Sequence, residues 1–241
     1  MGNLEVAVES QILWSSPSKE HFQHIRELPY NHLDSGLDVH MRKEGKTLYL
    51  AFQESNGRGD WTDNFNFTPE TFQMYTDVKA HRGLAGQYFS IRSFVKELLY
   101  SRQVDQIYVS GFSLGGAITV AAVQDIGYHI DKYNLKIKVF GIAYEPPRFF
   151  CAPNKIVAKS LKGRLLNVQN LHDPIVHLPL ICTLIPFTIS LKPWRIKILH
   201  PRWWLTFWKH YGKRVYIGKL WKFWPIQHRP DQVEKALGAL G

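Results

Sequence analysis

Apolar residues recur along the first two thirds of the chain at the spacings of strands and helices. Residues 37–43 and 46–53 alternate apolar and polar positions on either side of Glu44-Gly45, which predicts a β-hairpin. Residues 78–100 carry apolar side chains at helical spacing and predict an amphipathic helix. The remaining elements are predicted as strands over 106–110, 136–144 and 164–169, with helices over 114–127 and 155–161. This alternation favours an α/β fold whose central sheet is covered by helices on both faces.

The regular pattern ends at Pro179 and gives way to a stretch rich in Trp, Pro, Lys and Arg. Six of the eight tryptophans lie between residues 194 and 224. The apolar run at the start of this stretch is interrupted by proline and is shorter than the ~20 residues that cross a bilayer. We expect residues 180–209 to be an insertion within a single domain that spans 1–241, followed by a strand over 214–217 and a helix after Pro230.

Positive charge is concentrated in the second half of the chain. The formal net charge is +10, and residues 155–229 contain 14 basic side chains and one acidic one, Asp173. A basic region of this kind fits nucleic acid or an anionic membrane surface. No nucleic-acid-binding motif accompanies it, so no nucleic acid partner is expected. Trp beside Lys and Arg suits the headgroup region, which favours an anionic membrane surface at 180–209 with Trp203, Trp204 and Trp208 as its apolar contacts. The alternative for this segment is an extra packed subdomain.

Composition places the chain among globular proteins, since 45% of its residues are apolar and 21% are charged. Two cysteines, Cys151 and Cys182, exclude a disulfide framework and are compatible with a reducing compartment. The first ten residues contain Glu5 and Glu9 and no long apolar run, which argues against a signal peptide. With no transmembrane segment visible either, we expect a cytoplasmic protein, with peripheral membrane attachment as a further option.

The residues Gly111-Phe112-Ser113-Leu114-Gly115 lie between a predicted strand and a predicted helix. A nucleophile on such a sharp turn adopts a strained backbone conformation, and small residues two positions before and after it avoid a collision. The turn places the hydroxyl of Ser113 above the sheet. It also leaves the amide of Leu114 at the helix N-terminus, where negative charge is stabilised. We therefore predict Ser113 as a catalytic nucleophile and the Leu114 amide as an oxyanion donor.

A serine nucleophile needs an imidazole that takes its proton and a buried carboxylate that orients the imidazole. In α/β hydrolases the order along the chain is serine, acid, histidine. Asp173 is the only acidic residue between 146 and 230, and it follows the strand over 164–169. We predict Asp173 as the catalytic acid; the alternative is a structural aspartate that stabilises the turn at Pro174. Four downstream histidines are candidate bases: His177, His200, His210 and His228.

Four pieces of the sequence, in order, resemble the class 3 lipase family of fungal-lipase-like α/β hydrolases. They are residues 50–55 followed by Asp60-Trp61, then Ala80-His81-Arg82-Gly83, then the 111–117 turn, then residues 170–179. The resemblance implies an α/β-hydrolase fold with a mostly parallel central sheet, and a mobile lid at 56–65. The alternative for 56–65 is an ordinary surface loop anchored by Trp61. The resemblance also implies Ser55 as the second oxyanion donor and His228 as the base, on a loop before the last helix. His210, in a His-x-Gly element, has a structural role by this resemblance and is the alternative base.

The predicted function is that of a lipase-like serine hydrolase that cleaves carboxylic esters of lipids, either acylglycerols or phospholipids. Ser113, Asp173 and His228 form its triad, and it needs no cofactor and no metal. Gln53-Glu54 stand where the family has Arg-Gly before the oxyanion residue. Because a carboxylate beside an oxyanion is unfavourable, Glu54 supports an alternative, a catalytically impaired lipid- or membrane-binding protein that keeps the hydrolase fold.

Overall fold

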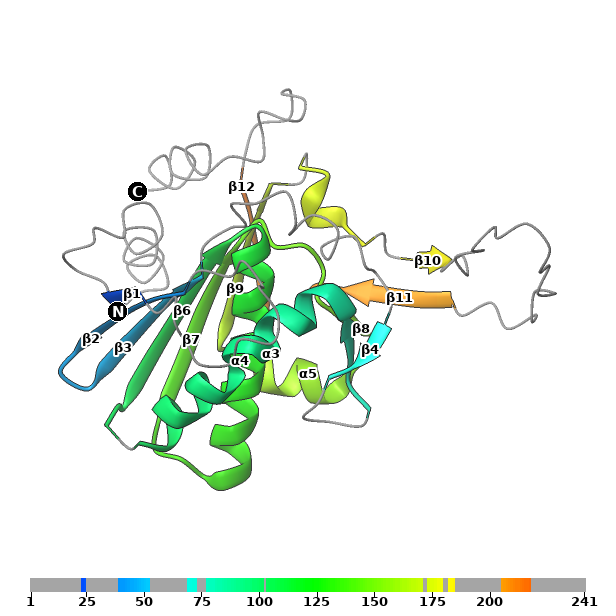
Figure 1. The fold of residues 1–241 in the computed structure, drawn as a ribbon. Helices are drawn as coiled ribbons and strands as arrows, with labels where there is room; N and C mark the ends of the chain where they lie inside the picture. The colour runs from blue at the N-terminus through cyan, green and yellow to red at the C-terminus, as the bar shows by residue number, and fades with distance from the viewer. Residues whose placement is uncertain are drawn as a thin grey trace, which may run out of the picture.

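A computed structural model describes the central part of the chain (Figure 1). The described residues are 23–24, 39–52, 69–72, 77–101, 103–170, 173–179, 182–184 and 205–217. The predicted helix after Pro230 lies outside these residues, as do Ser55, the expected lid at 56–65 and His228.

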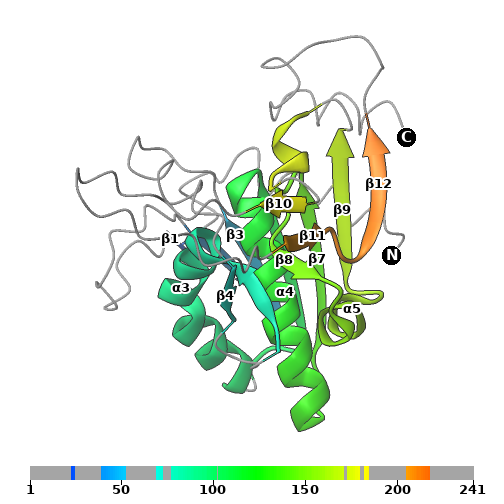
Figure 2. The same cartoon turned by 90° about the vertical axis from the view of Figure 1, so that its right-hand side faces the viewer.

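A seven-stranded sheet in the order β1-β2-β3-β6-β7-β9-β12 forms the centre of the molecule. Its strands are β1 (Gln23–His24), β2 (Val39–Glu44), β3 (Thr47–Phe52), β6 (Gln106–Phe112), β7 (Lys138–Tyr144), β9 (Leu165–Asn170) and β12 (Lys213–Ile217). Within this sheet, β3, β6, β7, β9 and β12 run parallel, whereas β2 pairs antiparallel with both β1 and β3. The predicted hairpin and the mostly parallel sheet are therefore confirmed. Figure 2 shows β9 and β12 side by side at one edge.

The described helices α3 (Arg82–Tyr100), α4 (Leu114–Tyr133) and α5 (Lys155–Leu161) lie on the same face of this sheet (Figure 1). α4 packs on β6 and β7, and α3 packs on α4. Since side chains alternate along a strand, the sheet also buries a second apolar cluster on its opposite face. Its buried members are Phe112, Ile142, Tyr144, Leu166 and Val168. Across the described ranges, no helix is long and apolar enough to cross a membrane.

Two helix boundaries differ from the prediction. α3 begins at Arg82 rather than at residue 78, because residues 79–81 form a strand and the Nδ1 atom of His81 caps the helix by accepting from the N–H of Leu84 at 3.3 Å. α4 continues past its predicted end at Gly127. A Cβ on Gly127 would lie 2.9 Å from the carbonyl oxygen of Ser160. This glycine therefore allows a close approach of α5 and does not end the helix.

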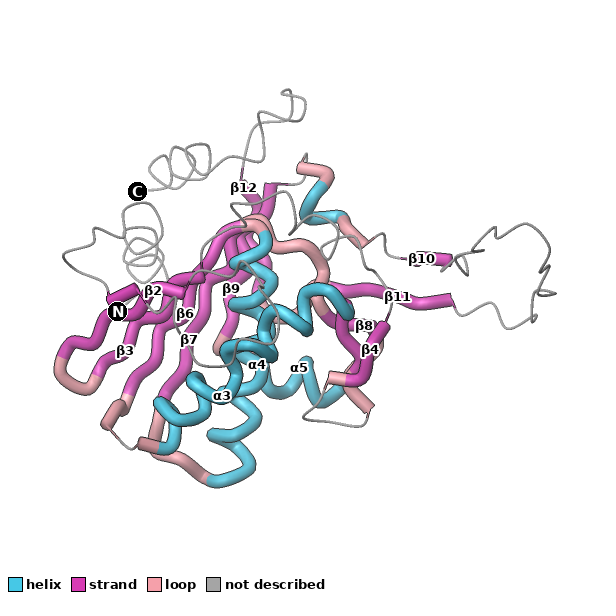
Figure 3. Tube along the Cα trace, viewed as in Figure 1, coloured by secondary structure: helices cyan, strands magenta, loops and turns pink. Residues whose placement is uncertain are grey.

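A smaller antiparallel sheet has the order β10-β11-β8-β5-β4. It consists of β4 (Pro69–Thr71), β5 (Lys79–His81), β8 (Phe150–Ala152), β10 (Cys182–Leu184) and β11 (Leu205–Lys209). Figure 3 shows it on the opposite side of the molecule from the β2–β3 hairpin. The sequence pattern did not predict these strands, because four of the five are three residues long. β11, from the end of the 180–209 insertion, pairs with β8.

A buried carboxylate links α3 to α4. Asp125 is 1% exposed and accepts hydrogen bonds from the hydroxyl of Tyr88 at 2.6 Å and from Nε of Arg92 at 2.8 Å. The Nε2 atom of His129 lies 3.1 Å from its other oxygen. Burial alone would raise the pKa of Asp125, but the contact with His129 and the charge of Arg92 outweigh burial and hold this pKa below its ordinary value.

Candidate active site

The turn between β6 and α4 holds Ser113 in a strained backbone conformation. Its φ is 54° and its ψ is −115°, a combination that residues other than glycine rarely adopt. A Cβ on Gly111 would lie 2.3 Å from the carbonyl oxygen of Gly115 and 2.9 Å from that of Phe52, so the turn requires glycine there. The strand–turn–helix arrangement predicted from the sequence is present and places Ser113 at the carboxyl end of the sheet.

Neighbouring backbone groups fix this turn. The N–H of Ser113 donates to the carbonyl of Tyr144 on β7 at 2.9 Å, and the N–H of Ala117 donates to the carbonyl of Ser113 at 3.1 Å. Leu114 is the first residue of α4, so its N–H has no acceptor within the helix. The helix dipole favours negative charge at this end. The local geometry therefore suits an oxyanion donor at Leu114.

Asp173 lies just beyond the carboxyl end of β9 and is 0% exposed. Its Oδ1 accepts from the N–H of Ile175 at 2.9 Å, and its own N–H donates to the carbonyl of Asn170 at 3.1 Å. The contact with the N–H of Ile175 stabilises the turn, which is the alternative role considered for Asp173. Because a carboxylate has two oxygens, the same turn can hold Asp173 in place while the second oxygen orients an imidazole.

Arg148 holds the loop that follows Asp173, which begins with the 3₁₀ turn η1 (Ile175–His177). Its guanidinium donates to the carbonyl of His177 and, at 2.6 Å, to the carbonyl of Pro179. Its backbone N–H donates to the carbonyl of Leu178, also at 2.6 Å. Arg148 thus binds three consecutive carbonyls of this loop. It follows β7, the neighbour of the strand that leads into the Ser113 turn.

His210, the alternative base, contacts the same loop. Its Nε2 lies 2.7 Å from the carbonyl oxygen of Val176. Burial lowers the pKa of His210 to about 4, and the charges of Arg148 and Arg214 act in the same direction, while the contact with Val176 opposes them. The ring is therefore neutral at pH 7, with one nitrogen engaged by a backbone carbonyl. These contacts support a bracing role for His210.

The structure brings three of the predicted site residues to one edge of the sheet. Ser113 and Leu114 follow β6, and Asp173 follows β9, with β7 between these strands. Ser55 and His228 lie outside the described residues, so their roles remain predictions. In the part of the chain that the structure describes, no three His, Cys, Asp or Glu side chains are grouped to hold a metal ion.

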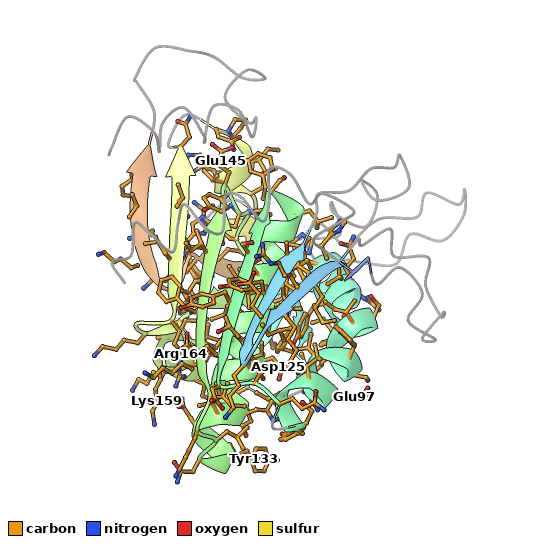
Figure 4. All side chains as sticks on the ribbon, turned by 90° about the vertical axis from the view of Figure 1, so that its left-hand side faces the viewer. Glu97, Asp125, Tyr133, Glu145, Lys159 and Arg164 are labelled. Carbon is orange, nitrogen blue, oxygen red and sulfur yellow. The ribbon has the colours of Figure 1, made fainter. Side chains whose placement is uncertain are left out.

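Glu145 is a buried acid at this edge that the sequence reasoning missed. It directly follows β7, is 1% exposed and has a positive φ of 47°. Its N–H donates to the carbonyl of Val168 on β9 at 2.7 Å. Figure 4 shows it at the carboxyl end of the sheet, with Asp125 and Tyr133 toward the other end. Its place directly after a predicted strand is the sequence feature that could have identified it, because sites in α/β sheets lie beyond the carboxyl ends of strands.

The family model for Lipase (class 3) matches residues 49–183, which is more than half of the chain. No curated protein sequence matches it. Several solved lipase structures share its fold. A Rhizomucor miehei triacylglyceride lipase is 17% identical with a TM-score of 0.56, and the match covers 88% of this chain and 79% of that one. A Penicillium expansum triacylglycerol lipase is 17% identical with a TM-score of 0.56, covering 89% and 78%.

A third structure is that of a triacylglycerol lipase whose catalytic centre is a serine protease triad. It is 20% identical with a TM-score of 0.52, and the match covers 66% of this chain and 60% of that one. The chain therefore spans less than two thirds of the length of that lipase. At these identities the likeness establishes the α/β-hydrolase fold alone, because a fold does not fix the chemistry of its site.

Proposed function

Because the chain belongs to the class 3 lipase family, we propose that it is a serine hydrolase that cleaves carboxylic esters of lipids. The observation that carries this proposal is the conformation of Ser113, held at a φ of 54° between a parallel strand and a helix. Backbone strain persists where the surrounding structure imposes it, and it concentrates at functional sites. A serine that served packing alone would need neither this strain nor the glycine at position 111 that makes room for the turn.

In the proposed reaction, Oγ of Ser113 attacks the ester carbonyl carbon while His228 takes its proton, which forms a tetrahedral oxyanion. The amides of Leu114 and Ser55 stabilise that oxyanion, and each such donor contributes about 10²–10³ in rate. The alcohol leaves with the proton from His228, and water then hydrolyses the acyl-enzyme. Asp173 orients the imidazole and stabilises its charged form. This sequence of steps uses neither a cofactor nor a metal.

Labelling with a fluorophosphonate probe tests whether Ser113 is a nucleophile. We expect the full chain to take up the probe and to hydrolyse a soluble p-nitrophenyl ester, and the Ser113→Ala variant to do neither. Ser110→Ala is a matched control, since Ser110 is also on β6 and is 0% exposed. It should label like the parent protein. Equal ester hydrolysis by Ser113→Ala and the parent would contradict the proposal.

The lipid class is tested by comparing emulsified acylglycerols with phospholipid vesicles as substrates. A structural neighbour with the same fold is a triacylglycerol lipase, which makes acylglycerols the first substrates to try. A chain that binds lipid without taking up the fluorophosphonate would instead be the impaired lipid-binding protein that Glu54 suggests.

We further propose that residues 180–209 attach the protein, from the cytoplasm, to an anionic membrane surface. The segment has five basic side chains and no acidic one, and each basic residue near such a surface contributes about 1 kcal/mol. In β11, Phe207 is 45% exposed. Trp208 is 2% exposed and its ring centroid lies 6.0 Å from that of His81. Trp208 therefore belongs to the interior, which corrects its expected place at a headgroup interface.

Co-sedimentation with vesicles tests this attachment. Binding should be stronger to vesicles of phosphatidylserine and phosphatidylcholine than to phosphatidylcholine alone, and salt should weaken it without abolishing it. Phe207→Ser should reduce binding, whereas Trp208→Ser should mainly lower the melting temperature. A parent protein that binds no vesicle under any of these conditions would mean that 180–209 is an ordinary packed subdomain.

A further inference from the structure

The order of the strands places Glu145 between the candidate nucleophile and the candidate acid. Ser113 follows β6, Glu145 follows β7 and Asp173 follows β9, and these strands are neighbours in this order. Adjacent strands lie about 4.8 Å apart, so the ends of β6 and β9 are separated by about 10 Å. An imidazole that takes a proton from Ser113 and is oriented by Asp173 therefore has to lie across the end of β7, where Glu145 is.

Backbone contacts hold Glu145 from both sides. The carbonyl of the preceding residue, Tyr144, accepts from the N–H of Ser113 at 2.9 Å, and the N–H of Glu145 donates to a carbonyl of β9 at 2.7 Å. A Cβ on Gly116 would lie 2.8 Å from the carbonyl oxygen of Tyr144 and 3.2 Å from the Cβ of Pro146. The segment that carries Glu145 is therefore packed against the first turn of α4, directly beside the strained serine.

Glu145 has a backbone conformation that glutamate rarely adopts. Its φ of 47° belongs to the left-handed region, where glycine, asparagine and aspartate are the usual residues. The residue is also 1% exposed, so its carboxyl group lies inside the protein. The left-handed backbone conformation does not favour glutamate for stability. Together, the conformation and the burial indicate that the carboxylate itself has a function at this edge.

We propose that Glu145 is a positioning residue of the active site, a second carboxylate beside Asp173 that stabilises the imidazolium formed when Ser113 attacks an ester. The inference rests on the serine-hydrolase function proposed above. In that step the bond between Oγ of Ser113 and the ester carbon forms, the carbonyl electron pair moves onto oxygen, and the proton moves to the imidazole. Glu145 takes no proton; its negative charge stabilises the charged ring.

Several other charged or titratable groups face this edge and contribute to the same balance. Arg148 and Arg214 lower the pKa of His210 and so oppose a positive charge in this region, whereas a nearby carboxylate favours one. Within the described part of the chain, this set consists of Glu145, Asp173, Arg148, His177 on η1, His210 and Arg214 on β12. Removing one of its two carboxylates should therefore make the catalytic imidazole easier to deprotonate.

The pH profile of ester hydrolysis tests this role, with a soluble p-nitrophenyl ester and the full chain. In Glu145→Gln the midpoint of the acidic limb of kcat/KM should move down by about 1 pH unit, the size of effect that one nearby opposite charge produces. At neutral pH kcat should fall about tenfold, while KM stays unchanged because no substrate contact is lost. Glu145→Asp retains the charge and should recover part of both effects.

The Glu145→Gly variant separates this role from folding. Glycine adopts a φ of 47° without strain, so this variant should melt at or above the temperature of the parent protein. It should nevertheless show the same shifted pH profile and lowered kcat as Glu145→Gln. A glutamate needed only for packing would give the opposite pattern, a lower melting temperature with the parent profile, and that result would overturn the inference.

A double variant tests whether Glu145 still contributes to turnover when residue 173 carries no charge. If both carboxylates stabilise the same charged ring, adding Glu145→Gln to Asp173→Asn should lower the residual activity further. A double variant as active as Asp173→Asn alone would count against the inference. Fluorophosphonate labelling separates the two proposals. A labelled, active parent with an unchanged Glu145→Gln profile overturns only the role of Glu145, whereas a parent that neither labels nor hydrolyses overturns both.

Discussion

The guanidinium of Arg148 donates a hydrogen bond of 2.6 Å to the carbonyl of Pro179, from a residue that is 7% exposed. Among the residues that the structure describes, no carboxylate pairs with Arg148, and its acceptors are carbonyls of the loop that follows Asp173. A hydrogen bond from a charged donor contributes about 1.5–3 kcal/mol. Burial and the charge of Arg214 lower the pKa of this guanidinium, but arginine remains charged at neutral pH. Arg148 thus uses a full charge to fix the backbone beside the candidate acid.

Replacing Arg148 with methionine should therefore displace the loop that carries Asp173. We expect kcat for a soluble ester to fall about 10²-fold, the cost of a misplacement of about 1 Å in a catalytic group. KM should change little, because the contacts that are lost are with the loop rather than with the substrate. Both side-chain bonds are donated by one guanidinium nitrogen, Nη1. Arg148→Lys keeps the charge but places its single nitrogen on a side chain of different shape, so it should give an intermediate kcat. Steady-state kinetics and thermal unfolding of the three proteins measure these effects.

Arg164 provides the matched control for this experiment. It pairs with Asp131 at 2.6 Å, with a side chain that is 23% exposed, and Figure 4 places it far from Glu145. Arg164→Met should lose some stability and leave kcat unchanged. If Arg148→Met were to keep the kcat of the parent protein, the positioning role of Arg148 would be wrong.

Elements with a regular apolar spacing could be predicted from the sequence, whereas the strands of the smaller sheet could not. α5 has the bounds predicted for it, because Asn154 caps it and its apolar spacing is regular. The smaller sheet escaped prediction because a three-residue strand shows almost no alternation. Its pairings also join distant parts of the chain, as in the register of Trp208 with Cys151. Such a register is set by tertiary contacts and leaves no local pattern.

The residues of the candidate site also fall into those that could be predicted from the sequence and those that could not. Ser113 could be identified because its turn imposes glycine at fixed positions on the sequence, and Asp173 because no other acid lies near it along the chain. Glu145 and Arg148 carry no such local pattern. Their importance follows from the strand order β6-β7-β9, which places the end of β7 between the serine and the acid. Sequence periodicity predicts strands but does not specify their neighbours.

Gly111→Ala should disrupt the turn that holds Ser113. The added Cβ would lie 2.3 Å from the carbonyl oxygen of Gly115 and 2.9 Å from that of Phe52, and both are backbone atoms that cannot rotate away. We expect a loss of stability above the about 1–3 kcal/mol typical of an overpacked core, together with loss of probe labelling. Gly45→Asn is the control, since Gly45 has a φ of 55° with open space around it and asparagine tolerates that conformation. Denaturant unfolding that gives the two variants equal stability would contradict this account.

Asp125→Asn should destabilise the packing of α3 on α4 without affecting hydrolysis. The amide cannot balance the charge of Arg92, and breaking a buried ion pair costs about 3–5 kcal/mol. Because the pKa of Asp125 is lowered in the folded protein, its stabilising effect is present above about pH 4 and disappears as the pH falls through the folded-state pKa. Asp131→Asn is the control on the same helix: its side chain is 40% exposed, so it should cost less than about 1 kcal/mol. Thermal unfolding at pH 7 and at lower pH distinguishes the two, and equal losses would show that the buried network does not stabilise the fold.

His210 should make the stability of the protein depend on pH in the acidic range. Burial lowers its pKa to about 4 in the folded protein, below its ordinary value of 6.5. The unfolded chain therefore binds the proton more tightly, so stability should fall as the pH drops from about 6.5 toward 4 and should level off below that. The loss from this residue is at most about 3 kcal/mol. His210→Asn keeps a donor for the carbonyl of Val176 but does not titrate, so its stability should vary less over this range.

The same variant separates the two candidate bases when its activity is measured beside that of His228→Ala. Loss of the base should cost about 10⁴–10⁶ in turnover, as removal of a triad member does, and should also abolish fluorophosphonate labelling. If His228 is the base, His228→Ala shows this loss, and His210→Asn keeps most of its turnover because it changes only a contact to the carbonyl of Val176. The reverse pattern, a labelled His228→Ala and an inactive His210→Asn, would assign the base to His210. In that event the ring would have to leave the carbonyl of Val176 to reach Ser113, and the neutral, buried state of His210 in the folded protein would be the form that accepts the proton.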